Sequence, residues 1–131
     1  MKGRFFKDDR GQAMVELALV LPILLILFMG VIEFGRVYHS YLVITNASRE
    51  GARVAILGGS DDAIKNRVGE VTAELDQTKL QTVVTPVPAE RTSGKLANID
   101  VQYQIPLVFP PFDIVLPNPL PLSSITVMRV E

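Results

Sequence analysis

The longest feature of the sequence is an apolar run close to its beginning. Residues 17–32 carry no charged side chain, and residues 13–32 carry one, Glu16. A helix of about twenty residues rises about 30 Å, which is the hydrocarbon thickness of a bilayer. The run therefore predicts one transmembrane helix. Pro22 should kink this helix without ending it, because membrane helices tolerate proline.

Past the run, apolar residues recur on one face only. Steps of three and four residues are typical of a helix with one buried face, so the helix should continue beyond the membrane as an amphipathic helix. Gly58 and Gly59 are expected to end it, because glycine commonly follows the last turn of a helix. The apolar face is formed by Phe34, Val37, Tyr38, Tyr41, Ile44 and Ser48.

A second helix is predicted over residues 62–79. Ser60 or Asp61 can cap its start, since a side-chain oxygen there accepts a hydrogen bond from a free backbone amide. The apolar residues of the segment follow one another at steps of four, three and four, and they form a narrow stripe for packing. They are Ile64, Val68, Val71 and Leu75.

Beyond the second helix the pattern is that of β-structure. Residues 82–87 are rich in β-branched side chains, residues 97–109 alternate between apolar and polar, and residues 123–130 form a further candidate strand. Residues 90–95 supply turn residues between the first two. The chain is thus predicted to have an α+β fold, with two helices and a small antiparallel sheet of about three strands. One face of the second strand would carry Ile99, Val101, Tyr103, Ile105 and Leu107, and one face of the third Ile125, Val127 and Arg129.

A proline-rich segment separates the last two strands. Residues 106–121 contain six prolines. Proline cannot donate to a β-ladder, so we expect an extended loop or an edge strand. Its apolar side chains must be covered, either by folding back on the long helix or by a partner protein. These side chains are Phe109, Phe112, Ile114, Val115 and Leu116.

Composition narrows the classes of function. The net charge is -1, there is no cysteine and there is a single histidine, His39. We therefore expect no nucleic-acid partner, no small-molecule substrate, no metal and no cofactor. The scattered acids after the long helix show no spacing typical of a general acid or of metal ligands, so the chain is not expected to be an enzyme. They include Glu70, Glu74, Asp100 and Asp113.

Basic residues in front of the apolar run predict its orientation. The run is preceded by four basic residues, Lys2, Arg4, Lys7 and Arg10, and by two acidic residues that partly offset their charge. Positive residues tend to stay in the cytoplasm. The part of the chain beyond about residue 34 should then lie outside the cytoplasmic membrane.

The apolar segment is expected to stay in the protein. A secretory signal peptide ends in a small-x-small cleavage site, and the residues that follow this run fit that pattern poorly. We divide the chain into a basic leader (1–11), a transmembrane half of the long helix (12–33) and an α+β domain outside the cytoplasmic membrane (34–131).

A simple membrane anchor does not require the carboxylate of Glu16 at the start of the apolar run. A carboxylate at the centre of a bilayer costs on the order of 2.5 kcal/mol or more, and less near the interface, so such acids are usually paired. A cut after Gly11 would make Gln12 the new amino terminus, one helical turn from Glu16. That amine could neutralise the carboxylate of its own chain or that of a neighbouring subunit.

These residues resemble a known family. A basic leader that ends in glycine, a glutamate five residues later and an apolar helix are typical of type IV prepilins and pseudopilins. Gln12 is polar where mature type IV pilins usually begin with an aromatic residue. Over residues 10 to about 58 the chain more closely resembles TadE-like proteins, minor pseudopilins of the tight-adherence (Flp) pilus. The matching positions are Gly11, Glu16, Pro22, Glu33, Gly35, Arg36, Ala47, Arg49, Glu50, Gly51, Ala52 and Arg53.

The resemblance implies a pilin-like protein with a structural role in pilus assembly. A membrane prepilin peptidase would cleave between Gly11 and Gln12. The implied partners are the membrane, this peptidase, other pilins or pseudopilins and the inner-membrane assembly platform. The implied location is the bacterial cytoplasmic membrane, with a single pass, and the protein could enter the filament. An uncleaved single-span adaptor that binds a periplasmic partner is the alternative.

The segment "NASREGARVA" carries small residues at helical spacing. Ala47, Gly51 and Ala55 lie four residues apart on one helix face and permit close backbone approach. Glu50 and Arg53 can pair at a spacing of three. This face could receive the second helix or the sheet of the same chain, or it could contact another subunit. Glu33 and Arg36 are expected to mark the periplasmic boundary of the membrane.

Overall fold

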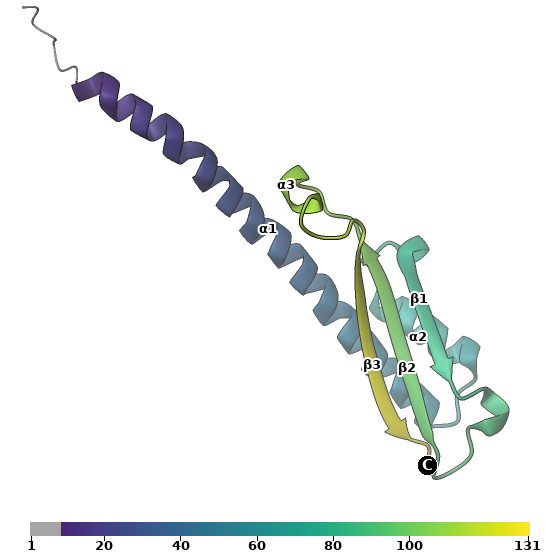
Figure 1. Cartoon of the computed structure of the whole chain (residues 1–131). Helices are drawn as coiled ribbons and strands as arrows, with labels where there is room; N and C mark the ends of the chain where they lie inside the picture. The colour runs from purple at the N-terminus through teal and green to yellow at the C-terminus, as the bar shows by residue number, and fades with distance from the viewer. Residues whose placement is uncertain (1–8) are drawn as a thin grey trace, which may run out of the picture.

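The structure, a computed structural model, describes residues 9–131. Lys2, Arg4 and Lys7 of the expected basic leader lie outside the described residues. The architecture is α+β, as predicted: a long helix, a second helix and a three-stranded antiparallel sheet. Figure 1 shows the long helix extending far beyond the sheet at its N-terminal end.

Helix α1 (Asp9–Ile56) is 48 residues long and contains Pro22 without interruption. At 1.5 Å per residue it is about 70 Å long. The expected continuation past the proline is confirmed. The helix ends where glycine was expected to end it: Gly58 has a φ of +79°, which glycine adopts without strain, and its amide bonds to the Ala55 carbonyl at 3.1 Å.

Helix α2 (Asp61–Val71) starts as predicted and ends eight residues earlier than predicted. The Ser60 side chain accepts a hydrogen bond from the Ala63 amide at 3.2 Å. At the other end, the predicted continuation to residue 79 is wrong. The Thr72 hydroxyl donates to the Val68 carbonyl at 2.8 Å, and the Gln77 side-chain amide donates to the Thr72 carbonyl at 2.6 Å. Side chains thus satisfy carbonyls at this end, and the chain turns into the short 3₁₀ helix η1 (Gln77–Lys79).

The sheet has the order β1-β2-β3 and is antiparallel throughout. Prolines set two of its boundaries, because proline lacks the amide that a ladder needs. Strand β1 stops before Pro86, and β2 stops before Pro106, earlier than predicted. Strand β3 starts at residue 120, so the predicted loop over 106–121 is too long by two residues; Pro121 is accepted because β3 is an edge strand. The strands are β1 (Leu80–Thr85), β2 (Leu96–Ile105) and β3 (Leu120–Arg129).

The segments between strands contain two short elements. The β1–β2 connection holds the 3₁₀ helix η2 (Pro88–Glu90), and Gly94 in it has a φ of +84°. The proline-rich connection between β2 and β3 holds a single helical turn, α3 (Pro110–Asp113), where an extended loop was predicted. Figure 1 places α3 at the end of the sheet that faces the N-terminal half of α1.

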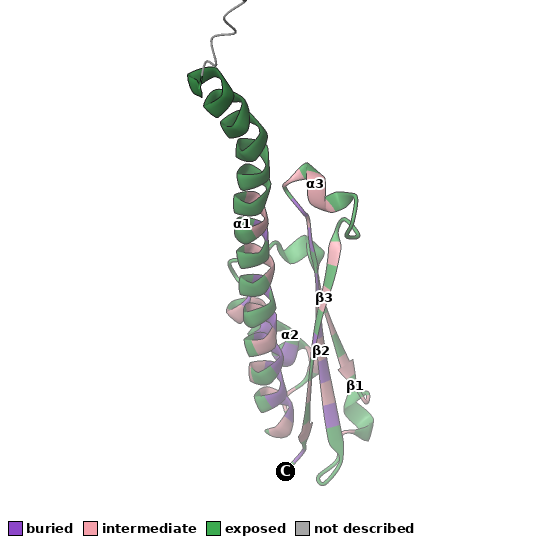
Figure 2. Cartoon of the chain, turned by 60° about the vertical axis from the view of Figure 1, so that its left-hand side comes forward, coloured by how far each residue is buried: buried purple, intermediate pink, exposed green. Residues whose placement is uncertain are grey.

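The core lies between one sheet face and the C-terminal half of α1 with α2. The predicted apolar face of β2 is the buried one, and it packs with Ile44 of α1 and Ile64 of α2. The face of β3 that carries Ile125, Val127 and Arg129 is the exposed one. Figure 2 shows burial confined to the C-terminal half of α1 and to the elements beside it.

Candidate functional site at the membrane boundary

Residues 9–28 of α1 have no cover from the rest of the protein. Its most apolar window of eighteen residues contains none that is buried, and α1 is the one described helix long and apolar enough to cross a membrane. In Figure 2 the N-terminal part of α1 is exposed and leans away from the domain. Such a surface is typical of a single-pass membrane protein, since an exposed apolar helix of this length would otherwise lie in water.

The predicted cleavage site lies at the start of this helix. Gly11 is the third residue of α1, and Gly11, Gln12 and Glu16 are all exposed. The Gln12 side-chain amide donates a hydrogen bond to Glu16 Oε1 at 3.2 Å. The spacing of four residues therefore brings polar groups of residue 12 to the carboxylate of residue 16.

Glu33 forms a buried polar junction where the covered part of α1 begins. It is 4% exposed, although it follows directly on the apolar run. Its Oε1 pairs with Arg36 Nη1 at 2.8 Å, and its Oε2 accepts from the Val108 amide at 3.3 Å. Arg36 also donates to the Pro106 carbonyl at 3.5 Å. The carboxylate is thus satisfied by an ion pair and by a backbone amide from the proline-rich connection.

The proline-rich connection folds back on α1, one of the two alternatives that the sequence left open. Leu107 is buried, and Asn118 Oδ1 accepts its amide at 3.1 Å. The Phe112 ring packs so closely on Gly30 that a Cβ atom there would lie 3.2 Å from the ring. A mainly apolar pocket of about 320 Å³ lies between this connection and α1. Ile114 nevertheless stays exposed, so the connection is only partly covered.

The small residues of α1 lie inside the subunit. Ala47 and Ala55 are buried in the core, and Gly51 is buried between them. A Cβ atom at position 51 would lie 2.9 Å from Val68 Cγ2 and 3.2 Å from Ile99 Cγ2. Glycine at this position allows α1 to approach α2 and β2 closely. This face of the helix is therefore occupied by the chain's own elements.

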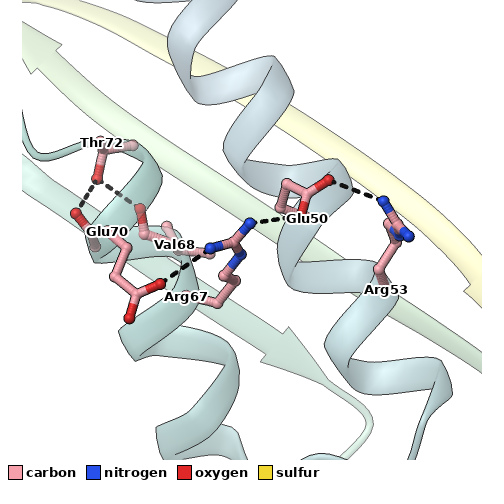
Figure 3. Close-up of polar contacts among 7 residues, drawn as sticks. Glu50, Arg53, Arg67, Val68, Glu70 and Thr72 are labelled. Carbon is pink, nitrogen blue, oxygen red and sulfur yellow. Dashed lines mark hydrogen bonds and ion pairs between the residues drawn. The ribbon is translucent and has the colours of Figure 1, made fainter.

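Glu50 and Arg53 meet on the surface beside this contact, in a four-residue ion network shown in Figure 3. Glu50 pairs with Arg53 at 3.4 Å and with Arg67 of α2 at 3.0 Å, and Arg67 also pairs with Glu70 at 3.0 Å. The hydrogen bond from Arg67 lowers the pKa of Glu50, and the same bond raises the pKa of Arg67. The network joins α1 to α2.

A buried hydroxyl cluster was not foreseen from the sequence. Ser48, counted there among the apolar face, is buried, and its Oγ lies 2.7 Å from Thr126 Oγ1 and 3.3 Å from Ser124 Oγ. It also donates to the Thr45 carbonyl at 2.9 Å. The cluster fixes α1 against β3. A serine at an apolar position of the helix and small hydroxyl residues on the inner side of the last strand are the signal that could have predicted it.

A second unforeseen contact involves Arg91, which the sequence places in a turn. Its side chain is 5% exposed, and it pairs with Asp61 at the start of α2. The β1–β2 connection is thereby attached to α2, and breaking such a pair would leave a charge with little access to water.

The contacts of these residues lie within the subunit and serve packing. Within residues 9–131, no group of three or more His, Asp or Glu side chains is placed to hold a metal ion. The ion pair between Glu50 and Arg67 connects α1 to α2, and the pair between Asp61 and Arg91 connects α2 to the β1–β2 connection. Glu33 is joined to the proline-rich connection by the hydrogen bond from the Val108 amide.

Comparison with known proteins gives one match, which lies within α1. No curated protein and no solved structure matches the chain. A family model does match, described as TadE-like protein, and the match covers residues 11–53. It starts at Gly11 and extends through Gly51 to Arg53, so it spans the exposed half of α1 and most of the half that packs in the core. Over these residues the resemblance to TadE-like proteins, a pilus-associated family, is confirmed.

Proposed function

We propose that this protein is a minor pseudopilin of a tight-adherence (Flp) pilus, processed by a prepilin peptidase between Gly11 and Gln12. Its role is structural and not catalytic. The single observation that carries the proposal is the TadE-like match that begins at Gly11, the residue after which cleavage is expected. The N-terminus would lie in the cytoplasm and residues 34–131 in the periplasm.

The geometry at the start of α1 supports this role. After cleavage, the amine of Gln12 would stand one helical turn from Glu16. The side-chain amide of residue 12 already reaches that carboxylate at 3.2 Å. A positive amine there would lower the cost of holding Glu16 in apolar surroundings, either in its own chain or in a neighbouring subunit.

The exposed half of α1 supports assembly with other subunits. Its apolar side chains are available all around the helix, so they can pack against lipid or against the helices of other pilins and pseudopilins without rearrangement of the domain. The small-residue face, by contrast, is already used inside the subunit. Contact with pilins and with the inner-membrane platform would therefore involve other surfaces.

Intact-mass spectrometry tests the proposal. The protein purified from cells that contain a prepilin peptidase should lack its first eleven residues, and the Gly11→Leu variant should keep them. Gly35→Leu is the matched control, because a Cβ atom at Gly35 meets nothing within 4 Å and the residue lies far from the cleavage site. An amino-terminal glutamine can cyclise, which would remove the amine that is proposed to meet Glu16, and the same spectrum shows whether Gln12 has done so. A wild-type chain that still begins at Met1 in such cells contradicts the proposal.

An uncleaved single-span adaptor is the second candidate. It is favoured by the exposed apolar side chain of Ile114, which could contact a periplasmic partner. In that case neither the wild type nor Gly11→Leu would be cleaved, and the substitution would leave pilus assembly unaffected.

A further inference from the structure

The proline-rich connection carries its most exposed apolar side chains at its tip. We call residues 106–119 the α3 loop. Ile114 is 85% exposed and Val115 is 81% exposed, while Val108 is 59% exposed. Phe112 of the same loop is turned toward α1. The loop is therefore attached by one side and presents apolar side chains on the other.

The α3 loop lies at the height of the membrane boundary. Phe112 packs on Gly30, which precedes Glu33 by three residues and so lies about 4.5 Å further toward the predicted membrane. Both Figure 1 and Figure 2 show α3 beside the middle of α1, at the end of the domain nearest the apolar half of the helix. The bond between Glu33 and the Val108 amide holds the loop at this height.

The apolar surface of the loop continues that of the span. Phe28, Val31 and Ile32 of α1 are exposed at the same level as Phe112. From residue 101 to residue 128, Asp113 is the one charged side chain. The loop and the helix therefore both expose apolar side chains near the contact between Phe112 and Gly30, and the single acid of the loop can remain among lipid headgroups.

The backbone of the loop is suited to an apolar surrounding. Five of the residues 106–119 are prolines, which have no amide to satisfy. Around the tip, the Phe112 amide bonds to the Phe109 carbonyl at 3.2 Å, and the Leu116 amide bonds to the Phe112 carbonyl at 2.8 Å. Free backbone amides are costly in lipid, so these bonds at the tip make its insertion cheaper.

We propose that the tip of the α3 loop, with Ile114 and Val115, inserts into the outer surface of the same membrane that α1 spans. The occupant of this apolar surface is lipid. Together, the helix and the loop would fix the rotation of the domain about α1 relative to the membrane, which a single helix leaves free. The inference does not depend on cleavage, because the cut after Gly11 leaves both the span and the loop in the chain.

Tryptophan fluorescence can test this directly, because the sequence contains no tryptophan. The full chain with Ile114→Trp is reconstituted in vesicles of phosphatidylcholine and phosphatidylglycerol, with and without bromine on the acyl chains. Ile125→Trp is the matched control, since Ile125 is an exposed apolar residue of the sheet face away from α1. Circular dichroism verifies that both variants fold.

The fluorescence of the Ile114→Trp variant should be quenched by the brominated lipid at least severalfold more than that of the Ile125→Trp variant, and it should be shielded from aqueous acrylamide. Equal quenching of the two variants by brominated lipid overturns the proposal. So does shielding of the Ile114→Trp variant that appears only as the protein-to-lipid ratio is raised, because a second copy of the chain and not lipid would then cover the tip. A Val115→Trp variant repeats the measurement one residue along.

Discussion

Glu33 and Val108 are 75 residues apart in the sequence, and a hydrogen bond of 3.3 Å joins the carboxylate of one to the amide of the other. This bond attaches the α3 loop to α1 at the point where the helix passes from an exposed to a covered environment. A buried acid at this place thus has a structural partner on each of its oxygens, Arg36 and Val108.

Replacement of Glu33 should therefore loosen the α3 loop. Glu33→Ala removes a charged acceptor and is expected to cost about 2 kcal/mol. Hydrogen exchange of the Val108 amide should become at least tenfold faster. Glu33→Gln keeps an oxygen for that amide and should have a smaller effect. Glu70→Gln, on an exposed side chain, is the control, and equal protection of Val108 in all variants would contradict the assigned contact.

Gly51→Leu should destabilise the domain by about 1–3 kcal/mol or more, because the added side chain would be forced against Val68 and Ile99. Gly35→Leu, in the same helix at a site without neighbours within 4 Å, should not. Chemical denaturation in detergent micelles, followed by circular dichroism, measures both. If Gly51→Leu were as stable as Gly35→Leu, the close approach of the helices would be wrong.

Acid should weaken the contact between α1 and α2. The pKa of Glu50 is lowered from its ordinary value of 4.5 by the hydrogen bond from Arg67. The stabilisation it supplies is therefore complete above about pH 4.5 and is lost as the pH falls through the lowered folded-state pKa. Asp76, whose pKa the Thr78 hydroxyl and amide also lower, acts with the same sign.

Unfolding curves recorded from pH 6 downward test this, and Glu50→Gln should show a shallower loss of stability with acid than the wild type. Arg67→Gln, which removes the main cause of the lowered pKa, should do the same. Asp76→Asn should also make the loss of stability with acid shallower, because the pKa of Asp76 is lowered. If the free energy of unfolding changed with pH equally in the wild type, Glu50→Gln and Arg67→Gln, titration of Glu50 would not contribute to stability.

The hydroxyl contact between Ser48 and Thr126 should appear as an energetic coupling. Ser48→Ala leaves a hydroxyl of β3 without its partner, at a cost of about 1–2 kcal/mol. In a double-mutant cycle with Thr126→Val, the double variant should lose less stability than the sum of the two single losses, with a coupling of about 1 kcal/mol. Ser93→Ala, on an exposed turn, serves as the control and should be neutral. Strict additivity would argue against the contact.

The role of Glu16 in assembly can be tested separately from cleavage after Gly11. If it acts after processing, Glu16→Gln should be cut at Gly11 as the wild type is, and it should fail to support pilus assembly because no charge remains to meet the new amine. Mass spectrometry and counts of surface pili give the two readouts. Normal pilus numbers with Glu16→Gln would remove the role proposed for this carboxylate.

Local periodicity was enough to predict most of the fold. The long helix, the alternating face around Ile99 and the glycine stop at Gly58 all follow from residues that are neighbours in sequence. The contacts of Glu33, Ser48 and Arg91 were not predictable in the same way, because each partner lies 30 or more residues away and is chosen by the packing of the sheet on α1.

The end of α2 shows the same limit on a smaller scale. The stripe from Ile64 to Leu75 has helical spacing, yet α2 ends at Val71, where the side chains of Thr72 and Gln77 bond to backbone carbonyls. The spacing of apolar residues does not reveal that side chains will bond to the backbone carbonyls at this point. At the candidate site, the family resemblance identified the positions, and the structure added what each position touches.

Helix α1 passes from its exposed half into the domain without a break, from Asp9 to Ile56. It therefore connects its two ends stiffly, unlike a flexible linker. A pull on the domain would be transmitted along the helix axis to its apolar N-terminal half, and a twist of that half would turn the sheet with it. A force applied at one end of α1 would therefore also move the other end.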